Sequence, residues 1–153
     1  MDIIFEKHID TKRIVISPRP IWKCRTCFMY NKRPSCPPYT PLWKEAKEWL
    51  SFYKKALLIK FDISMDRFDE EKRDVIYYLL DKERFFFNQS NPFAFSLFPG
   101  SCNLCYSCSF EKKGVCIHPK KVRPSVDALG IELTSITEIS FKETVLYGVV
   151  LIS

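Results

Sequence analysis

The sequence predicts an α+β or mixed α/β fold in which helices flank a small mixed sheet. Apolar runs of strand length alternate along the chain with segments whose apolar residues recur every three or four positions. Two cysteine-rich stretches, expected to be loops, interrupt this alternation. The chain has 153 residues, 46% of them hydrophobic, which is enough for one core. We therefore expect a single domain over residues 1–153.

Four segments have the composition of β-strands. Residues 1–17 are expected to form one or two short strands, because their apolar residues are rich in β-branched types. Residues 55–63 and 144–152 are apolar runs of strand length. Residues 92–98 predict another strand, which ends at the turn-forming pair Pro99-Gly100.

Two segments are expected to form amphipathic helices. Residues 41–53 have apolar side chains at helical spacing, and Thr40 and Pro41 suit the N-cap and the first helical position. Asp66 is expected to cap the next helix, whose first turn is acidic. The buried stripe of that helix is expected to comprise Phe68, Val75, Leu79 and Phe86. Residues 124–129 predict a short helix that the following glycine closes.

The stretch between residues 18 and 40 is expected to be an irregular loop. It holds five of the ten prolines, and proline removes backbone donors and restricts φ. The loop also contains the first three cysteines, so we expect something other than a regular hydrogen-bond ladder to hold it.

The composition and the N-terminal residues restrict the cellular compartment and the classes of function that we expect. No run of eighteen apolar residues is present, which predicts no membrane-spanning helix. The N-terminal residues lack the pattern of a signal peptide, so we expect a cytoplasmic protein. In a reducing cytosol thiols stay free or bind metal, and seven cysteines cannot all pair in disulfides. The net charge of +6 suits nucleic acid, but no clear nucleic-acid-binding signature accompanies it, so a solvated basic surface is expected.

The downstream cysteines have the spacing of a metal centre. Cys102, Cys105 and Cys108 follow one another with two residues between each pair, and Cys116 lies eight positions further on. A triple run of this kind resembles the ferredoxin pattern for a four-iron (4Fe-4S) cluster, whereas zinc sites usually use separate pairs. In the ferredoxin pattern the last cysteine precedes proline, but here Pro119 comes three residues later. The match is therefore to the set of ligands rather than to the full motif.

The upstream cysteines, Cys24, Cys27 and Cys36, form an incomplete set. Three thiolates can complete a zinc site with a fourth ligand from elsewhere, such as His8 or His118. Alternatively they can hold a four-iron cluster that leaves one iron open to substrate. Because four cysteines already suffice downstream, His118 is expected to donate a hydrogen bond to a metal ligand or to pack in the loop rather than to bind the metal itself.

Both stretches resemble a known family. The motifs "CRTCFMYNKRPSCPPYTPLW", "FPGSCNLCYSCSFEKKGVCIHP" and "RPSVDALGI" resemble the predicted metal-binding proteins of domain-of-unknown-function family 2284, small proteins of archaea and anaerobic bacteria. The resemblance covers about residues 22–133 and implies no established reaction. The chain departs from the family just before the second motif, where it has "AFSLFPG" and the family usually has a more glycine-rich sequence. The resemblance implies that the metal ligands are Cys24, Cys27, Cys36, Cys102, Cys105, Cys108 and Cys116.

Three functions remain open from the sequence. The first is an iron–sulfur protein that acts in electron transfer or as a redox accessory, with basic residues that dock an acidic redox partner. The second is an enzyme that uses an open iron at the three-cysteine site, and the third is a zinc-stabilised binding module. No Ser-His-Asp set, phosphate-binding glycine loop or carboxylate pair is recognisable, and Asp127 and Glu132 are expected to be cap or surface charges.

Overall fold

The larger sheet of the protein has four strands in the order β1-β3-β6-β4. The structure is a computed structural model that describes residues 1–153. The strands are β1 (Asp2–Asp10), β3 (Lys55–Asp62), β4 (Phe95–Leu97) and β6 (Val145–Leu151). Every neighbouring pair is antiparallel. The fold is therefore α+β, and the sheet that we expected to be mixed has parallel pairing only at an isolated bridge between Phe98 and Ser125.

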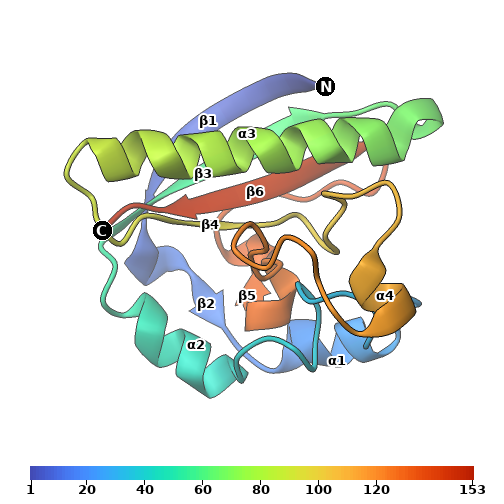
Figure 1. The fold of residues 1–153 in the computed structure, drawn as a ribbon. Helices are drawn as coiled ribbons and strands as arrows, with labels where there is room; N and C mark the ends of the chain where they lie inside the picture. Colours follow the sequence, from blue (N-terminus) through green and yellow to red (C-terminus); the bar gives the residue numbers. More distant parts are fainter.

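A second, two-stranded sheet and the helices surround the larger sheet. The small sheet pairs β2 (Val15–Ile16) with β5 (Ile131–Glu132). The helices are α1 (Arg19–Arg25), α2 (Trp43–Leu50), α3 (Phe68–Asn88) and α4 (Ser109–Lys113). Short 3-10 turns cover Thr11–Arg13, Met65–Arg67, Asp127–Leu129 and Leu133–Ser135. Figure 1 shows α3 along the large sheet, with α1, α2 and the small sheet on the opposite side.

Both faces of the central strands β3 and β6 are buried, whereas the edge strand β1 is mostly exposed. Side chains of successive strand residues point to opposite faces. On β3, Leu58 belongs to the core under α2 and the small sheet, whereas Ile59 belongs to the core under α3. Helix α3 lies close to β6: a Cβ added to Gly148 would lie 2.5 Å from the Leu79 side chain. The sheet is thus the middle layer of a three-layer arrangement, and both cysteine-rich segments lie outside it (Figure 1).

Most of the predicted elements are present. The strands expected at 55–63 and 144–152 are β3 and β6, and residues 1–17 form β1 and β2. Helix α3 has the expected acidic first turn. Of its predicted stripe, Val75 and Leu79 are buried, and Phe68 and Phe86 pack against the same core. The 3-10 turn Asp127–Leu129 ends at Gly130, whose φ of 82° is the left-handed conformation that glycine adopts readily.

Several local expectations were wrong. Residues 18–40 are not wholly irregular, because α1 forms there; Pro20 lies in its first turn, where proline costs no hydrogen bond. Helix α2 starts at Trp43 after Leu42, so Thr40 does not cap it. Asp66 lies within a 3-10 turn and caps no helix. The strand expected at 92–98 is only three residues long.

None of the helices combines the length with the apolar character that a membrane-spanning segment needs.

Candidate metal centres

The upstream cysteines lie in a chain of tight turns that follows α1. Cys24 is near the end of that helix, and the Cys27 amide donates to the Cys24 carbonyl over 3.0 Å. The Cys36 amide donates to the Arg33 carbonyl over 3.1 Å. The Asn31 amide donates to the Pro37 carbonyl over 3.0 Å, which brings the two ends of the loop together. Backbone turns therefore order this segment, and they present three thiols from one short stretch.

The three upstream thiols share one cavity of about 750 Å³. Its walls come from α1, from the turns after it, from β5 and from the 3-10 turn Asp127–Leu129. The polar and charged side chains of the wall include Arg19, Lys23, Ser101, Asp127 and Glu132. The cavity is therefore large enough for a small molecule beside the cysteines.

Burial keeps the Cys24 and Cys36 thiols protonated in the absence of a cation. It raises the pKa of the Cys24 thiol to about 12, and the negative charges of the nearby Asp127, Cys36 and Cys27 add to the rise. Burial also raises the pKa of Cys36. A bound metal would reverse this preference, because a cation stabilises thiolates directly.

The two carboxylates in the wall, Glu132 and Asp127, differ in their hydrogen bonds and in the direction in which their pKa is shifted. Arg19 and Ser17 donate to Glu132, and these hydrogen bonds, that from Arg19 first, lower the pKa of Glu132 to about 2. Asp127 makes no ion pair and no side-chain hydrogen bond. It is exposed on the cavity side and surrounded by protein elsewhere, and this burial raises the pKa of its carboxyl.

Neither histidine completes the upstream set. His8 is exposed on strand β1 and is not in the cavity wall. His118 lies beside the downstream cysteines instead. The fold therefore places neither of the two histidines that the sequence offers as a fourth zinc ligand in the wall of this cavity.

The four downstream cysteines gather around one small cavity of about 20 Å³. Its wall also includes Arg33 from the upstream loop and His118. Cys108 precedes α4, and the chain turns back at Gly114, whose φ is 76°. This turn brings Cys116 to the three cysteines that precede it. The helix α4 between them was not expected from the sequence, because it has only five residues.

Backbone amides point at sulfur in both segments. The Met29 amide donates to Cys27 Sγ over 3.4 Å, and the His118 amide donates to Cys116 Sγ over 3.3 Å. Burial raises the pKa of Cys102 to about 11, while a hydrogen bond from the Leu104 amide opposes the rise. N–H groups directed at sulfur stabilise the thiolate form that binds metal. The backbone amide of His118 therefore contributes a hydrogen-bond donor to a cysteine.

Direct contacts join the two segments. The Cys102 amide donates to Ser35 Oγ over 2.7 Å, and Ser35 Oγ lies 3.8 Å from Cys36 Sγ. Arg33 donates to the Cys102 carbonyl over 2.6 Å and forms an ion pair with Glu111 at 2.9 Å. Figure 1 shows α1 and α4 at the same end of the molecule, which is where these contacts lie.

Lys72 of α3 is a buried cation between the two segments. Its side chain is 4% exposed, it forms no ion pair, and its one hydrogen bond is to Ser101 Oγ over 3.3 Å. Burial lowers the pKa of Lys72 to about 8, and the thiols of Cys36 and Cys102 oppose this shift more than any other groups. The natural counter-charge for this ammonium group is therefore thiolate rather than carboxylate.

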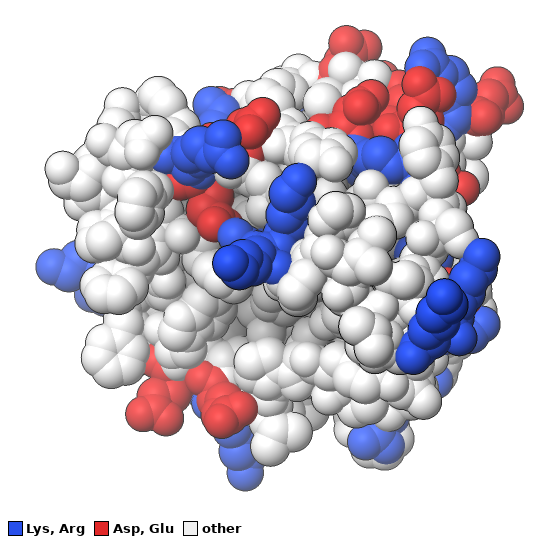
Figure 2. All heavy atoms as spheres, in the orientation of Figure 1, with Lys and Arg blue, Asp and Glu red and all other residues white.

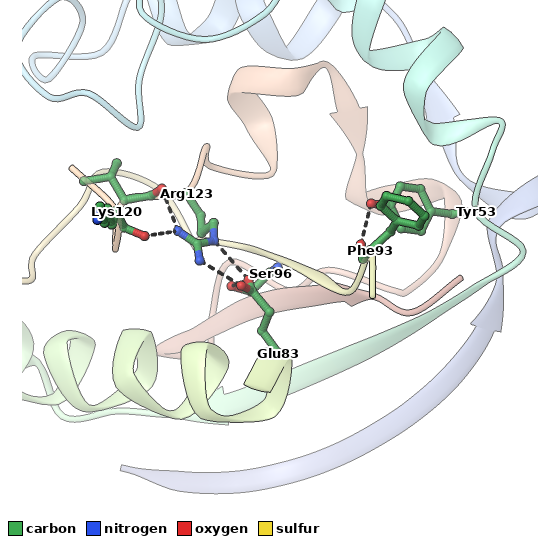
Figure 3. A network of polar contacts seen from close by, with 7 residues as sticks. Tyr53, Glu83, Phe93, Ser96, Lys120 and Arg123 are labelled. Atoms are coloured by element: carbon green, nitrogen blue, oxygen red, sulfur yellow. Dashed lines mark hydrogen bonds and ion pairs between the residues drawn. The ribbon is translucent and has the colours of Figure 1, made fainter. Parts of the chain in front are cut away.

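A polar network anchors the end of the downstream segment to the core (Figure 3). The Arg123 guanidinium donates to both carboxylate oxygens of Glu83, over 3.0 and 2.7 Å, and to the Lys120 carbonyl over 2.8 Å. The amide and hydroxyl of Ser96 donate to Glu83 Oε2 over 2.7 and 2.8 Å. The network thus ties the segment to α3 and β4. At the right of Figure 3, apart from this network, the Tyr53 hydroxyl donates to the Phe93 carbonyl over 2.6 Å.

The cysteines surround cavities rather than converge on a point. No three His, Cys, Asp or Glu side chains meet in the arrangement of a single-ion site. The donor chemistry nevertheless fits a thiolate-bound metal group: all seven thiols are free, and they fall into the four-and-three division that the sequence predicts.

Three polar residues around the cysteines were not recognisable as site residues from the sequence. These are Ser35, Lys72 and Asp127. Lys72 looks like an ordinary charged residue of an amphipathic helix, and Asp127 looks like a capping residue. A possible signal is the position of Ser35 directly before a cysteine. The other two are brought to the cysteines only by tertiary packing.

The family model described as "Predicted metal-binding protein (DUF2284)" matches residues 7–146. This range includes all seven cysteines. No curated protein and no solved structure matches the chain.

Proposed function

The chain belongs to the DUF2284 family of predicted metal-binding proteins, and from this membership and its cysteines we propose that it is an iron–sulfur protein with two centres. Cys102, Cys105, Cys108 and Cys116 hold one 4Fe-4S cluster, and the upstream trio holds a second metal centre. The protein acts in electron transfer or as a redox accessory in the reducing cytoplasm. The clusters supply the redox chemistry when bound, and the side chains bind and tune them.

One observation supports two centres above all. Cys24, Cys27 and Cys36 line one cavity, and the other four cysteines line a different one. Four thiolates are the usual ligand set of a 4Fe-4S cluster, so the downstream group needs no further ligand. The upstream group needs one ligand more, from the protein or from a bound molecule.

The surroundings of the cysteines suit negatively charged metal–thiolate groups. Amides of Met29 and His118 point at sulfur, and the ammonium group of Lys72 is buried beside Cys36 and Cys102. Hydrogen bonds to sulfur and nearby positive charge both raise the potential of a cluster. The potential of both centres therefore depends on these residues.

The downstream cavity must widen when a cluster binds, because about 20 Å³ holds little more than one water molecule. Much of the segment around the cysteines is exposed to solvent, including Tyr106 at 93% and Ile117 at 63%. Its ends are anchored at the amide of Cys102 and the guanidinium of Arg123. Between them, Leu104 is buried in the core and Glu111 pairs with Arg33, so widening would have to occur around these fixed points.

A basic surface next to the downstream cysteines suits an acidic redox partner. Exposed lysines flank the segment at Lys112, Lys113, Lys120 and Lys121. Figure 2 shows Lys and Arg side chains on the side of the molecule where α4 lies, while Asp and Glu side chains gather near the start of α3. Positive charge around a centre steers an acidic partner toward it and makes association depend on ionic strength.

Two other functions have specific support. The cavity of about 750 Å³ beside Cys24, Cys27 and Cys36 suits an enzyme in which a substrate reaches an open metal position. Four thiolates also match the ligand set of a structural zinc site, so the downstream cysteines would suit a zinc-stabilised binding module once they converge on the ion.

Selective loss of metal tests the two-centre arrangement. Cys36→Ala is expected to leave the downstream centre loaded, and Cys105→Ala is expected to abolish it while the upstream metal remains. Metal per chain and visible spectra are compared after anaerobic purification, with Ser107→Ala as the control because Ser107 is exposed in the same segment. Loss of all bound metal in Cys36→Ala would instead indicate one shared site.

A further inference from the structure

We propose that the Asp127 carboxylate is the fourth, exchangeable protein ligand of the upstream centre. The inference rests on the proposed function, since it needs metal at Cys24, Cys27 and Cys36. It assigns a role to a residue that the sequence suggests is only a cap or surface charge. The class of molecule that replaces it at the metal is a small thiol or another soft, anionic donor.

Position is the first argument. Asp127 lines the same cavity as the three cysteines. It begins the 3-10 turn Asp127–Leu129, which packs against α1, the helix that carries Cys24.

Elimination is the second argument. The wall of the cavity holds no histidine and no further cysteine. Its other carboxylate, Glu132, is bound by Arg19 and Ser17. Asp127 has no such partner and caps no helix, because the residue before its turn occupies the capping position. It is therefore the one acidic group in the wall that can turn to a metal without breaking an ion pair.

The difference between carboxylate and thiolate as metal ligands makes Asp127 the exchangeable one. Thiolates are soft ligands that suit iron–sulfur and zinc centres, whereas carboxylates are hard and prefer harder cations. A carboxylate beside three thiolates is thus the weakest member of the set. The cavity of about 750 Å³ gives a competing sulfur donor access to the position.

Two substitutions at Asp127 test the proposal. They are made in the Cys105→Ala background, so that only the upstream centre contributes to the visible and electron-paramagnetic-resonance spectra. Asp127→Cys supplies a fourth sulfur, and Asp127→Asn weakens the oxygen ligand at constant size. Glu132→Gln is the matched control, because it removes the other carboxylate of the same wall. Each anaerobically loaded protein is titrated with 2-mercaptoethanol.

The Cys105→Ala parent, which keeps Asp127, is expected to show a spectral shift that saturates as thiol is added. Asp127→Cys is expected to have the shifted spectrum before any thiol is added and to show no further change. Asp127→Asn is expected to reach saturation at a several-fold lower thiol concentration. Glu132→Gln should titrate as the parent does. If the parent holds metal but Asp127→Cys and Asp127→Asn both titrate as it does, Asp127 is not a ligand. If the parent holds no upstream metal, the proposed function fails at this centre together with the inference.

Discussion

The backbone amide of Cys102 donates a hydrogen bond to the Ser35 hydroxyl over 2.7 Å, although the two residues are 67 positions apart in the sequence. The same hydroxyl lies 3.8 Å from Cys36 Sγ, so one side chain contacts a cysteine of each group. Ser35 is fully buried and therefore has no water to replace a lost partner. The two groups of cysteines line separate cavities and are joined through this serine.

Ser35→Ala is expected to weaken both centres at once. It leaves the buried Cys102 amide without an acceptor, which costs about 1–3 kcal/mol in the free energy of unfolding. Urea unfolding measures this cost, and metal per chain measures the effect on the centres. Ser107→Ala is the control, since Ser107 is exposed and forms no hydrogen bond. Loss of metal from only one centre would contradict the bridging role of Ser35.

Lys72→Met is expected to affect metal-free and loaded protein in opposite directions. Without metal it removes a buried cation that has no ion pair, so the unfolding temperature should stay the same or rise. With metal it removes the positive charge beside the thiolates, so metal should stabilise the variant less, by about 1–3 kcal/mol. Thermal unfolding with and without metal measures both effects, and exposed Lys113→Met is the control. Equal stabilisation by metal in wild type and Lys72→Met would contradict this role.

Glu83→Gln is expected to destabilise the metal-free protein at neutral pH by about 2–3 kcal/mol, because the pair with Arg123 is partly buried. Burial acts to raise the pKa of Glu83, but hydrogen bonds from Arg123 and Ser96 outweigh it and lower the pKa. The pKa of Glu83 is thus lower in the folded than in the unfolded protein. Its ionised carboxylate therefore contributes its full stabilisation above the unfolded pKa of about 4.3, and this contribution is lost as the pH falls through the folded pKa.

The stability difference between wild type and Glu83→Gln should therefore shrink only in acid, below about pH 4. Denaturant unfolding of metal-free protein across pH 3–7 measures it. Glu70→Gln removes an exposed pair with Arg67 and should cost less than about 1 kcal/mol. A Glu83→Gln difference that stays constant down to pH 3 would rule out the carboxylate as its source.

The sequence predicted those features that depend on neighbouring residues. Continuous apolar runs located β3 and β6, because these strands are buried on both faces, and a helical apolar pattern located α3, which packs on the sheet. The spacing of Cys102, Cys105 and Cys108 predicted that these thiols face one common site, because two intervening residues let neighbouring thiols in a turn point the same way, and they line one cavity. Local chemistry thus suffices for the grouping of the downstream cysteines.

Features that depend on distant contacts were missed. Asp127 reaches the Cys24 cavity only because its turn packs against α1, and Lys72 reaches Cys36 only because α3 covers the sheet. The proline-rich segment that contains α1 was expected to be irregular, since proline is usually a helix breaker; its place in the first turn removes that penalty. The direction of strand pairing also depends on connections that periodicity does not reveal.

The most direct test of the central claim is the iron and acid-labile sulfide content of protein purified without oxygen, read together with its visible and electron-paramagnetic-resonance spectra. Cys24, Cys27 and Cys36 and the four downstream cysteines are predicted to yield brown protein with several irons and a similar amount of sulfide per chain. Colourless protein that carries stoichiometric zinc and no sulfide would contradict the iron–sulfur assignment.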